Sequence, residues 1–241
     1  EQGDEEDDGG GGGGGDGGGG RRDRGGIDIW RRENIALYCS YAAVGLCDGL
    51  VGGTVKSFCY YSWPDEDNNV CAVSGSVVRL GWSVKIFIAY LCEAHRPFGL
   101  RRKPYIAGGW ASGVGVLVLI ALLADRLSFP AYVALAGLFE FLMMFAEVSA
   151  DGYTVELSRL EPPSRRGRIL ADGQICRFGM NIVAGALQCT LLNGPSTNPE
   201  GRGFGWGLTI SQMYWMLVAV VAPPLAASLY LFRERPPDPK G

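Results

Sequence analysis

The sequence contains few of the residues from which metal centres and nucleophilic active sites are built. It has a single histidine, His95, in 241 residues, and none of its seven cysteines forms a CxxC pair or lies at ligand spacing from that histidine. The cysteines are also too scattered for a small disulfide-built scaffold. No metal, cofactor or nucleic-acid partner is therefore indicated, and we do not expect an enzyme.

Hydrophobic residues are absent from the first 20 positions, where an acidic run precedes a glycine tract. Such a segment cannot bury enough surface to offset its chain entropy, so we expect it to be disordered. Residues 1–33 are predicted to form an acidic, glycine-rich tail that turns basic at its end. The first residue is not Met, and we expect the chain to begin inside a longer product.

Charge is scarce in six apolar blocks that follow this tail. About 20 helical residues cover a hydrocarbon core of about 30 Å, and each block approaches that length. The block at 105–124 has no charged residue, which a surface helix of a soluble protein could not sustain. We predict an all-α membrane protein with six transmembrane helices. They lie at approximately 34–56, 74–94, 105–124, 130–150, 169–192 and 208–232.

Lysine and arginine are unevenly distributed between the blocks. Sixteen of the 22 lie before the first block, between the second and third, between the fourth and fifth, or after the sixth. Because cytosolic loops are enriched in these residues, we expect both termini in the cytosol. The sequence does not distinguish a plasma membrane from an organelle envelope. Cys59 and Cys71 flank a loop on the outer side, where a disulfide is conceivable.

The most informative ionisable residues are five that lie within the predicted spans, where facing lipid would be costly. They are Asp48, Lys85, Glu140, Glu147 and Arg177. We expect them to face partners or a water-filled path, although buried ion pairs that only fix helix register are an alternative. Estimated depths suggest that Asp48 pairs with Lys85, and that Arg177 pairs with an acid of the fourth span.

Helical spacing predicts a polar stripe on each of the fourth and fifth spans, which favours a wet cavity between them. Glu140 lies deepest on the acidic stripe and is a candidate proton carrier. The predicted substrate and proton pathway comprises Asp48, Lys85, Glu140, Glu147, Gln174, Arg177, Asn181 and Gln188. Glycines four residues apart, at Gly45, Gly49 and Gly53 and again at Gly109 and Gly113, predict close helix packing.

Two stretches resemble the folate/biopterin transporter family of the major facilitator superfamily. Residues 80–106 read LGWSVKIFIAYLCEAHRPFGLRRKPYI, and residues 146–169 read AEVSADGYTVELSRLEPPSRRGRI. The resemblance extends over about Ile35–Arg235. It implies a bundle of two six-span halves that alternate access to a central site, and it implies folates, pterins or related anions as substrates, moved with protons.

The resemblance also assigns a cytosolic gate to the basic loop after the second span, where basic residues would engage Glu93 and Asp151. The implied gate motif comprises Glu93, Gly99, Arg101, Arg102, Lys103, Asp151 and Glu156. Lys85 and Arg177 would hold the carboxylates of a folate-like solute. The sequence departs from the family at Glu93, which replaces the usual Asp, and at Ile86, where a Pro is common.

Only six spans are present, and the chain stops at residues 233–241, where the superfamily's central loop would begin. We therefore expect an amino-terminal half, which needs a second six-helix half in the same longer chain or in a partner chain. Two alternatives are a non-transporting membrane protein whose charge pairs are structural, and a facilitator-type carrier of a different metabolite. A membrane enzyme has the least support.

Overall fold

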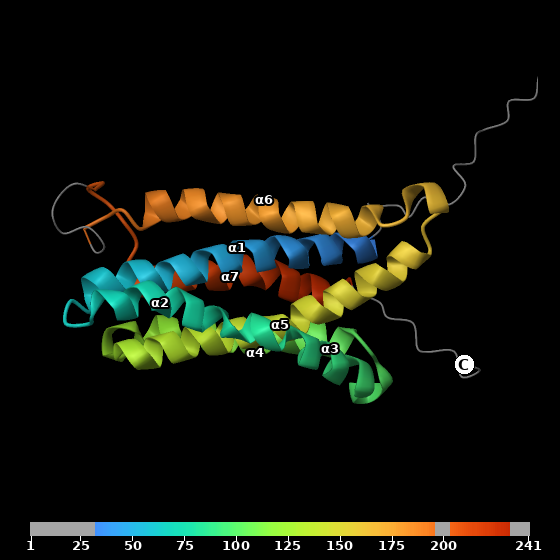
Figure 1. Ribbon diagram of the computed structural model, residues 1–241, viewed down its shortest axis with the longest axis horizontal. Helices are drawn as coiled ribbons and strands as arrows, with labels where there is room; N and C mark the ends of the chain where they lie inside the picture. The colour runs from blue at the N-terminus through green and yellow to red at the C-terminus, as the bar shows by residue number, and fades with distance from the viewer. Residues whose placement is uncertain (1–31, 196–202, 232–241) are drawn as a thin grey trace, which may run out of the picture.

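The computed structural model describes residues 32–195 and 203–231, which form a helical bundle without β-strands (Figure 1). The predicted tail up to Arg31 and the predicted loop at 233–241 lie outside the described residues. The α-helices are α1 (Arg32–Ser62), α2 (Asn68–Val78), α3 (Lys85–Ala94), α4 (Lys103–Leu123), α5 (Phe129–Arg159), α6 (Arg168–Leu191) and α7 (Ile210–Tyr230). The 3₁₀ segments are η1 (Arg79–Val84), η2 (Pro97–Gly99), η3 (Ala124–Arg126) and η4 (Pro163–Arg165).

Each of the six predicted blocks contains a helix, but two features were not predicted. The second block is one crossing, Asn68–Ala94, in which the 3₁₀ segment η1 separates α2 from α3. Helices α1 and α5 have 31 residues each, about 46 Å at 1.5 Å per residue, which exceeds a hydrocarbon core of about 30 Å. They continue past the apolar blocks into polar sequence, so hydropathy alone underestimates their length.

Five helices of the described residues are long and apolar enough to cross a membrane, and α6 is not among them. Its charged and amide side chains lower its hydropathy, so composition supports five of the six predicted spans. The burial pattern of α6 is nevertheless reversed from that of a soluble protein. Arg177 is only 8% exposed, whereas Ile175 and Ile182 are 69% and 76% exposed. A helix that hides its charge and exposes its apolar face suits a lipid or protein environment.

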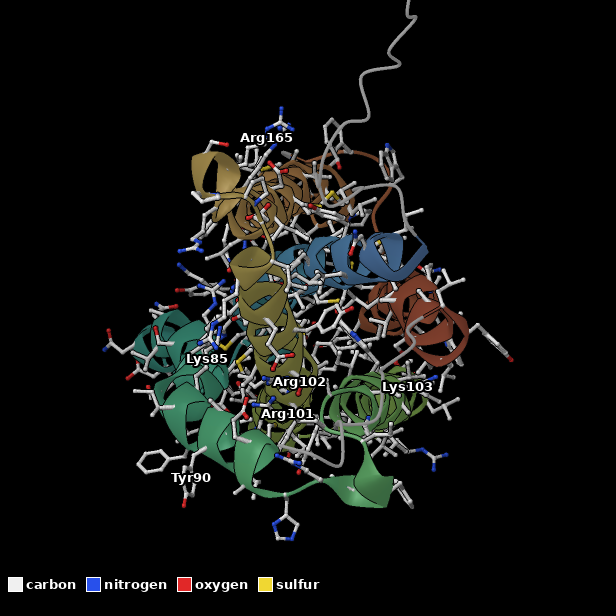
Figure 2. The ribbon with its side chains drawn as sticks, turned by 90° about the vertical axis from the view of Figure 1, so that its right-hand side faces the viewer. Lys85, Tyr90, Arg101, Arg102, Lys103 and Arg165 are labelled. Carbon is white, nitrogen blue, oxygen red and sulfur yellow. A yellow bond between two sulfur atoms is a disulfide. The ribbon has the colours of Figure 1, made fainter. Side chains whose placement is uncertain are left out.

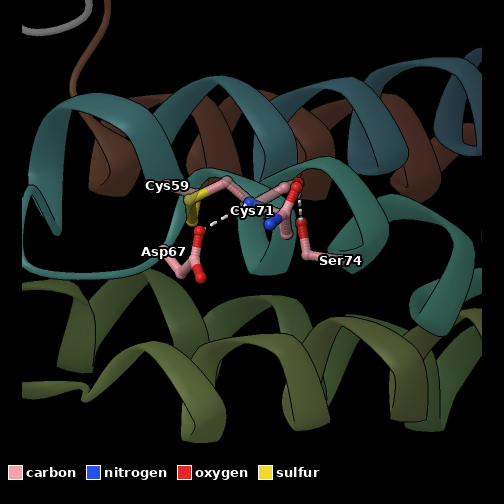
Figure 3. The surroundings of a disulfide bond; sticks show 5 residues. Cys59, Asp67, Cys71 and Ser74 are labelled. Atoms are coloured by element: carbon pink, nitrogen blue, oxygen red, sulfur yellow. Dashed lines mark hydrogen bonds between the residues drawn. A yellow bond between two sulfur atoms is a disulfide. The ribbon is translucent and has the colours of Figure 1, made fainter.

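The connections between helices lie at two opposite ends of the bundle (Figure 1). At one end, here called the disulfide end, a Cys59–Cys71 disulfide joins the last turn of α1 to the first turn of α2. Asp67 caps α2 there by accepting a hydrogen bond of 3.1 Å from the Asn69 backbone N–H. The Asp67 backbone carbonyl oxygen accepts a hydrogen bond of 3.1 Å from the Cys71 backbone N–H beside the disulfide (Figure 3). The disulfide that the sequence left open is therefore formed.

The opposite end, here called the arginine end, carries many of the basic residues between the predicted spans. Figure 2 shows Arg101, Arg102 and Lys103 at this end near the α3–α4 connection, and Arg165 in η4 between α5 and α6. Helix α6 starts there in an ordered way because the Glu161 carboxylate accepts hydrogen bonds of 2.7–3.2 Å from the first backbone N–H groups of that helix and from the residue before it. This contact fixes the start of the helix that carries Arg177.

Helix α1 lies at the centre of the bundle and packs along α6, with α7, α2 and α5 as its other neighbours. A side chain at Gly45 would collide with the backbone of Arg177, and one at Gly49 would collide with Ala184. Gly109 of α4 meets the backbone of α5 in the same way. The predicted packing role of these glycines is confirmed, and it brings the polar stripe of α6 against α1.

Candidate functional site

The five intramembrane ionisable residues predicted from the sequence point into the bundle rather than toward its perimeter. Glu140 and Glu147 from α5 and Arg177 from α6 are buried. The side chains of Asp48 on α1 and Lys85 on α3 are 15% and 30% exposed. Four separate helices therefore contribute charge to one region of the interior.

Glu147 is the centre of an ion network that joins α3, α5 and α6. Its Oε1 atom accepts a hydrogen bond of 3.0 Å from Lys85 Nζ and a second, short one from Arg177 Nη1. Lys85 Nζ also donates to Asp151 Oδ2 at 2.8 Å. The predicted bridge between Arg177 and an acid of the fourth span is therefore present, and the acid is Glu147. Two cations and two carboxylates balance one another in this network.

Two aromatic residues that sequence reasoning missed complete the network. Trp82, in η1, lies beneath both cations, with its ring centroid 4.4 Å from Arg177 Cζ and 5.2 Å from Lys85 Nζ. Tyr41 donates a hydrogen bond of 2.8 Å from its hydroxyl to Asp151 Oδ1. Tyr41 lies seven residues before Asp48, so the helical repeat could have placed it on the same face of α1.

The predicted pairing of Asp48 with Lys85 is wrong. Asp48 instead forms an ion pair of 3.3 Å with Nε of Arg79 and accepts a hydrogen bond of 3.0 Å from the amide of Asn181. The prediction assumed α-helical geometry throughout the second span. The intervening 3₁₀ segment has about 3.0 residues per turn and a rise of about 2.0 Å, which turns Lys85 toward α5. Arg79 lies inside the predicted span and was overlooked.

Glu140 has an unusual environment for a carboxyl group. Among the described residues, neither of its oxygens has a hydrogen-bond partner, and the same is true of Glu147 Oε2. The charged groups that interact electrostatically with the Glu140 carboxyl group are Asp48, Arg79, Glu147 and Arg177. Because buried polar groups nearly always have partners, Glu140 is exceptional among the buried carboxyl groups of the described residues.

The remaining residues of the predicted pathway lie on the polar stripe of α6. Asn181 contacts Asp48, as described, and Gln188 donates a short hydrogen bond from its amide to the backbone carbonyl oxygen of Gly49. Gln174 is half-buried one turn before Arg177. The stripe therefore extends from the ion network toward the disulfide end.

A second ionic cluster lies at the arginine end and contains much of the predicted gate. Arg101 and Arg102 both bind Glu93 of α3 and Glu156 of α5, with contacts of 2.5–2.9 Å besides one shorter contact. Arg102 is buried because its guanidinium lies where a Cβ at Gly152 would be. The cluster ties the α3–α4 connection to α5.

Two residues of the predicted gate lie elsewhere. Asp151 was expected to engage the basic loop, but it forms its ion pair with Lys85 because it lies five residues deeper than Glu156 on α5. Lys103 donates a hydrogen bond of 2.9 Å to the Leu229 carbonyl oxygen near the end of α7. Gly99 adopts a φ of 73°, the left-handed conformation that glycine favours, in the turn before the two arginines.

Membrane-length apolar helices around buried, shared ion pairs define a multi-pass integral membrane protein with a polar interior. The chain matches the BT1 family over residues 45–230, and it belongs to that family, the folate/biopterin transporters. The resemblance identified from the sequence is therefore confirmed, and the protein is a membrane transporter by family. No curated protein and no solved structure matches the chain significantly.

Proposed function

We propose that this protein moves folates, pterins or related organic anions across a membrane together with protons. Family membership supports transport, and the network of Lys85, Glu147 and Arg177 supports the anionic substrate class. This network is the observation that carries the proposal. Two cations in a membrane interior are held by a carboxylate that a substrate carboxylate can replace without changing the local charge.

The substrate exchange follows from the chemistry of the network. A carboxylate of the solute binds Lys85 and Arg177, and Glu147 then takes up a proton so that no unpaired negative charge stays in the interior. The flat ring of a pterin can lie against Trp82, whose ring already contacts both cations. Loss of the proton restores the ion pairs and releases the solute.

Glu140 is proposed as a second proton site. It lies two turns before Glu147 on α5, and its oxygens have no hydrogen-bond partner among the described residues. A proton that leaves Glu147 could be relayed toward it through water in a polar cavity. Such a relay couples the charge of the network to the pH difference across the membrane.

The cluster of Arg101, Arg102, Glu93 and Glu156 is proposed to act as the gate at the arginine end, which we assign to the cytosol from its basic loops. With these ion pairs formed, the α3–α4 connection stays on α5 and that end is closed. Release of solute there requires the pairs to break. We further propose that the chain supplies one six-helix half of a major facilitator-type bundle, and that a second half completes the pathway.

Uptake of labelled folate and pterin by cells that express the full-length protein tests this function. Arg177→Ala is expected to abolish uptake while the amount of protein in the membrane is unchanged. Arg168→Ala is the matched control, because Arg168 lies on the same helix but is exposed. Its ion pair with Asp172 is long, at 3.8 Å between Nε and Oδ2. Equal uptake by the Arg177 and Arg168 variants would exclude Arg177 from substrate binding.

A further inference from the structure

A polar pocket of about 360 Å³ lies between α1, α2 and α6, outside the network around Glu147. Its wall includes two cations, Lys56 from α1 and Arg79 from the start of η1, and the amide side chains of Asn181 and Gln188 from α6. Lys56 precedes the disulfide by three residues, so the pocket lies toward the disulfide end. No residue of this pocket belongs to the ionic cluster at the arginine end.

The two cations of this pocket have capacity for a further acceptor. Within the described ranges Lys56 forms no ion pair, and its side chain is exposed. Arg79 pairs through Nε with the Asp48 carboxylate and donates from Nη2 to the Asp48 backbone carbonyl oxygen, both at 3.3 Å, and its side chain is half-exposed. Asp48 also accepts a hydrogen bond from the Asn181 amide, which fixes its carboxylate. The fixed carboxylate orients the Arg79 guanidinium and leaves Nη1 of Arg79 available to a solute. The pocket lining and Asp48 together contribute two positive charges and one negative charge.

Glycines in the wall make room for these polar groups. A Cβ at Gly52 would lie 3.0 Å from Arg79 Nη2, and a Cβ at Gly53 would overlap the amide of Gln188. Larger residues at these positions would push both side chains out of the pocket. The backbone of α1 thus forms a floor on which donors from α2–η1 and α6 converge.

We propose that this pocket is a second anion site, in which Lys56 and Arg79 bind a carboxylate of the transported solute. The inference rests on the proposed function and specifies how one class of substrate is selected. Asn181 lies one helical turn beyond Arg177, a rise of about 6 Å, so one solute with separated charged groups can reach both the network and the pocket. A solute whose single carboxylate is bound by the network gains nothing from the pocket.

The experiment compares uptake of two solutes by the full-length protein: folate, whose glutamate moiety carries two carboxylates, and a pterin that carries a single carboxylate. Lys56→Gln is expected to raise the KM for folate roughly tenfold and to leave the KM for the pterin within about twofold. Lys56→Arg is expected to restore folate uptake. Arg126→Gln removes an exposed positive charge from η3, also at the disulfide end but outside the pocket, and is the matched control.

Arg79→Gln is expected to act in the same direction as Lys56→Gln, but it also removes the partner of Asp48. The double variant Asp48→Asn with Arg79→Gln removes both charges and separates that effect from binding. Equal changes for folate and pterin in the Lys56→Gln variant, or no change for either, would overturn the second anion site while leaving transport itself intact. Uptake of neither solute by the unsubstituted protein would overturn both proposals.

Discussion

Replacing Glu147 with Gln is expected to destabilise the protein more than replacing either of the cations that it binds. Glu147 is the only acid among the described residues that forms an ion pair with Arg177, whereas Lys85 has a second acid in Asp151. The substitution therefore leaves Arg177 buried against Trp82 without a carboxylate. The converse change, Arg177→Gln, leaves Glu147 paired with Lys85.

The magnitudes follow from this asymmetry. Removing one partner of a buried ion pair costs about 3–5 kcal/mol, and we expect Glu147→Gln to fall near 3 because Trp82 still contacts the guanidinium. Arg177→Gln should cost about 1–2 kcal/mol, since one charged hydrogen bond is lost and another is kept. The double variant should cost about 1–2 kcal/mol less than the sum of the two single variants.

Unfolding of the purified protein in mixed detergent micelles, followed by circular dichroism, measures these differences. Glu93→Gln is the matched control: Glu93 also binds two arginines, but its side chain is 41% exposed, and its loss should cost no more than about 1 kcal/mol. The reasoning is refuted if Glu147→Gln is no more destabilising than Glu93→Gln. It also fails if the double variant is strictly additive.

Three other changes probe separate parts of the structure. Glu140→Gln should flatten the dependence of uptake on external pH, whereas Asp125→Asn, in the exposed α4–α5 connection, should leave it unchanged; equal slopes for both variants would remove Glu140 from the proton path. Cys59→Ser should lower stability by roughly 2–4 kcal/mol, measured by thermal unfolding in detergent, and an unchanged midpoint would contradict a stabilising disulfide. Arg102→Gln should loosen the arginine end and speed labelling of the buried Cys92 by a water-soluble maleimide, and protection equal to that of the parent would argue against a gate there.

Much of the fold could be predicted because lipid imposes simple physical constraints on sequence. Apolar blocks of membrane length marked the helices, and the cost of charge in lipid indicated that Glu147 and Arg177 point inward. Depth along two continuous α-helices was enough to predict an Arg177 bridge to the fourth span. The glycine stripe on α1 was equally informative, since spacing of four places Gly45 and Gly49 on one face.

The wrong predictions of ion pairs arose for two reasons. The chain departs from a continuous α-helix at η1, and only the depth of each residue in the membrane was considered. The 3₁₀ segment η1 changes both depth and direction for every residue after Arg79, so counting along an α-helix misplaced Lys85, while Arg79 itself was overlooked. Depth also carries no information about the direction around the helix axis. Asp151 and Glu156 lie only five residues apart on α5, yet one joins the interior network and the other the arginine end.

Helix α6 shows why hydropathy and function conflict in this protein. Its polar stripe supplies Arg177 to the network and Asn181 to Asp48, and those same residues keep it below the apolarity of the other five crossings. Helix α1 compensates by presenting glycines, which bring the two backbones close enough for the stripe to be enclosed. In this protein, the polar side chains of α6 are enclosed because the glycines of the neighbouring helix α1 let the two helices pack closely. The low hydropathy of α6 is therefore a sign of its place beside the candidate pathway, and not evidence against its crossing the membrane.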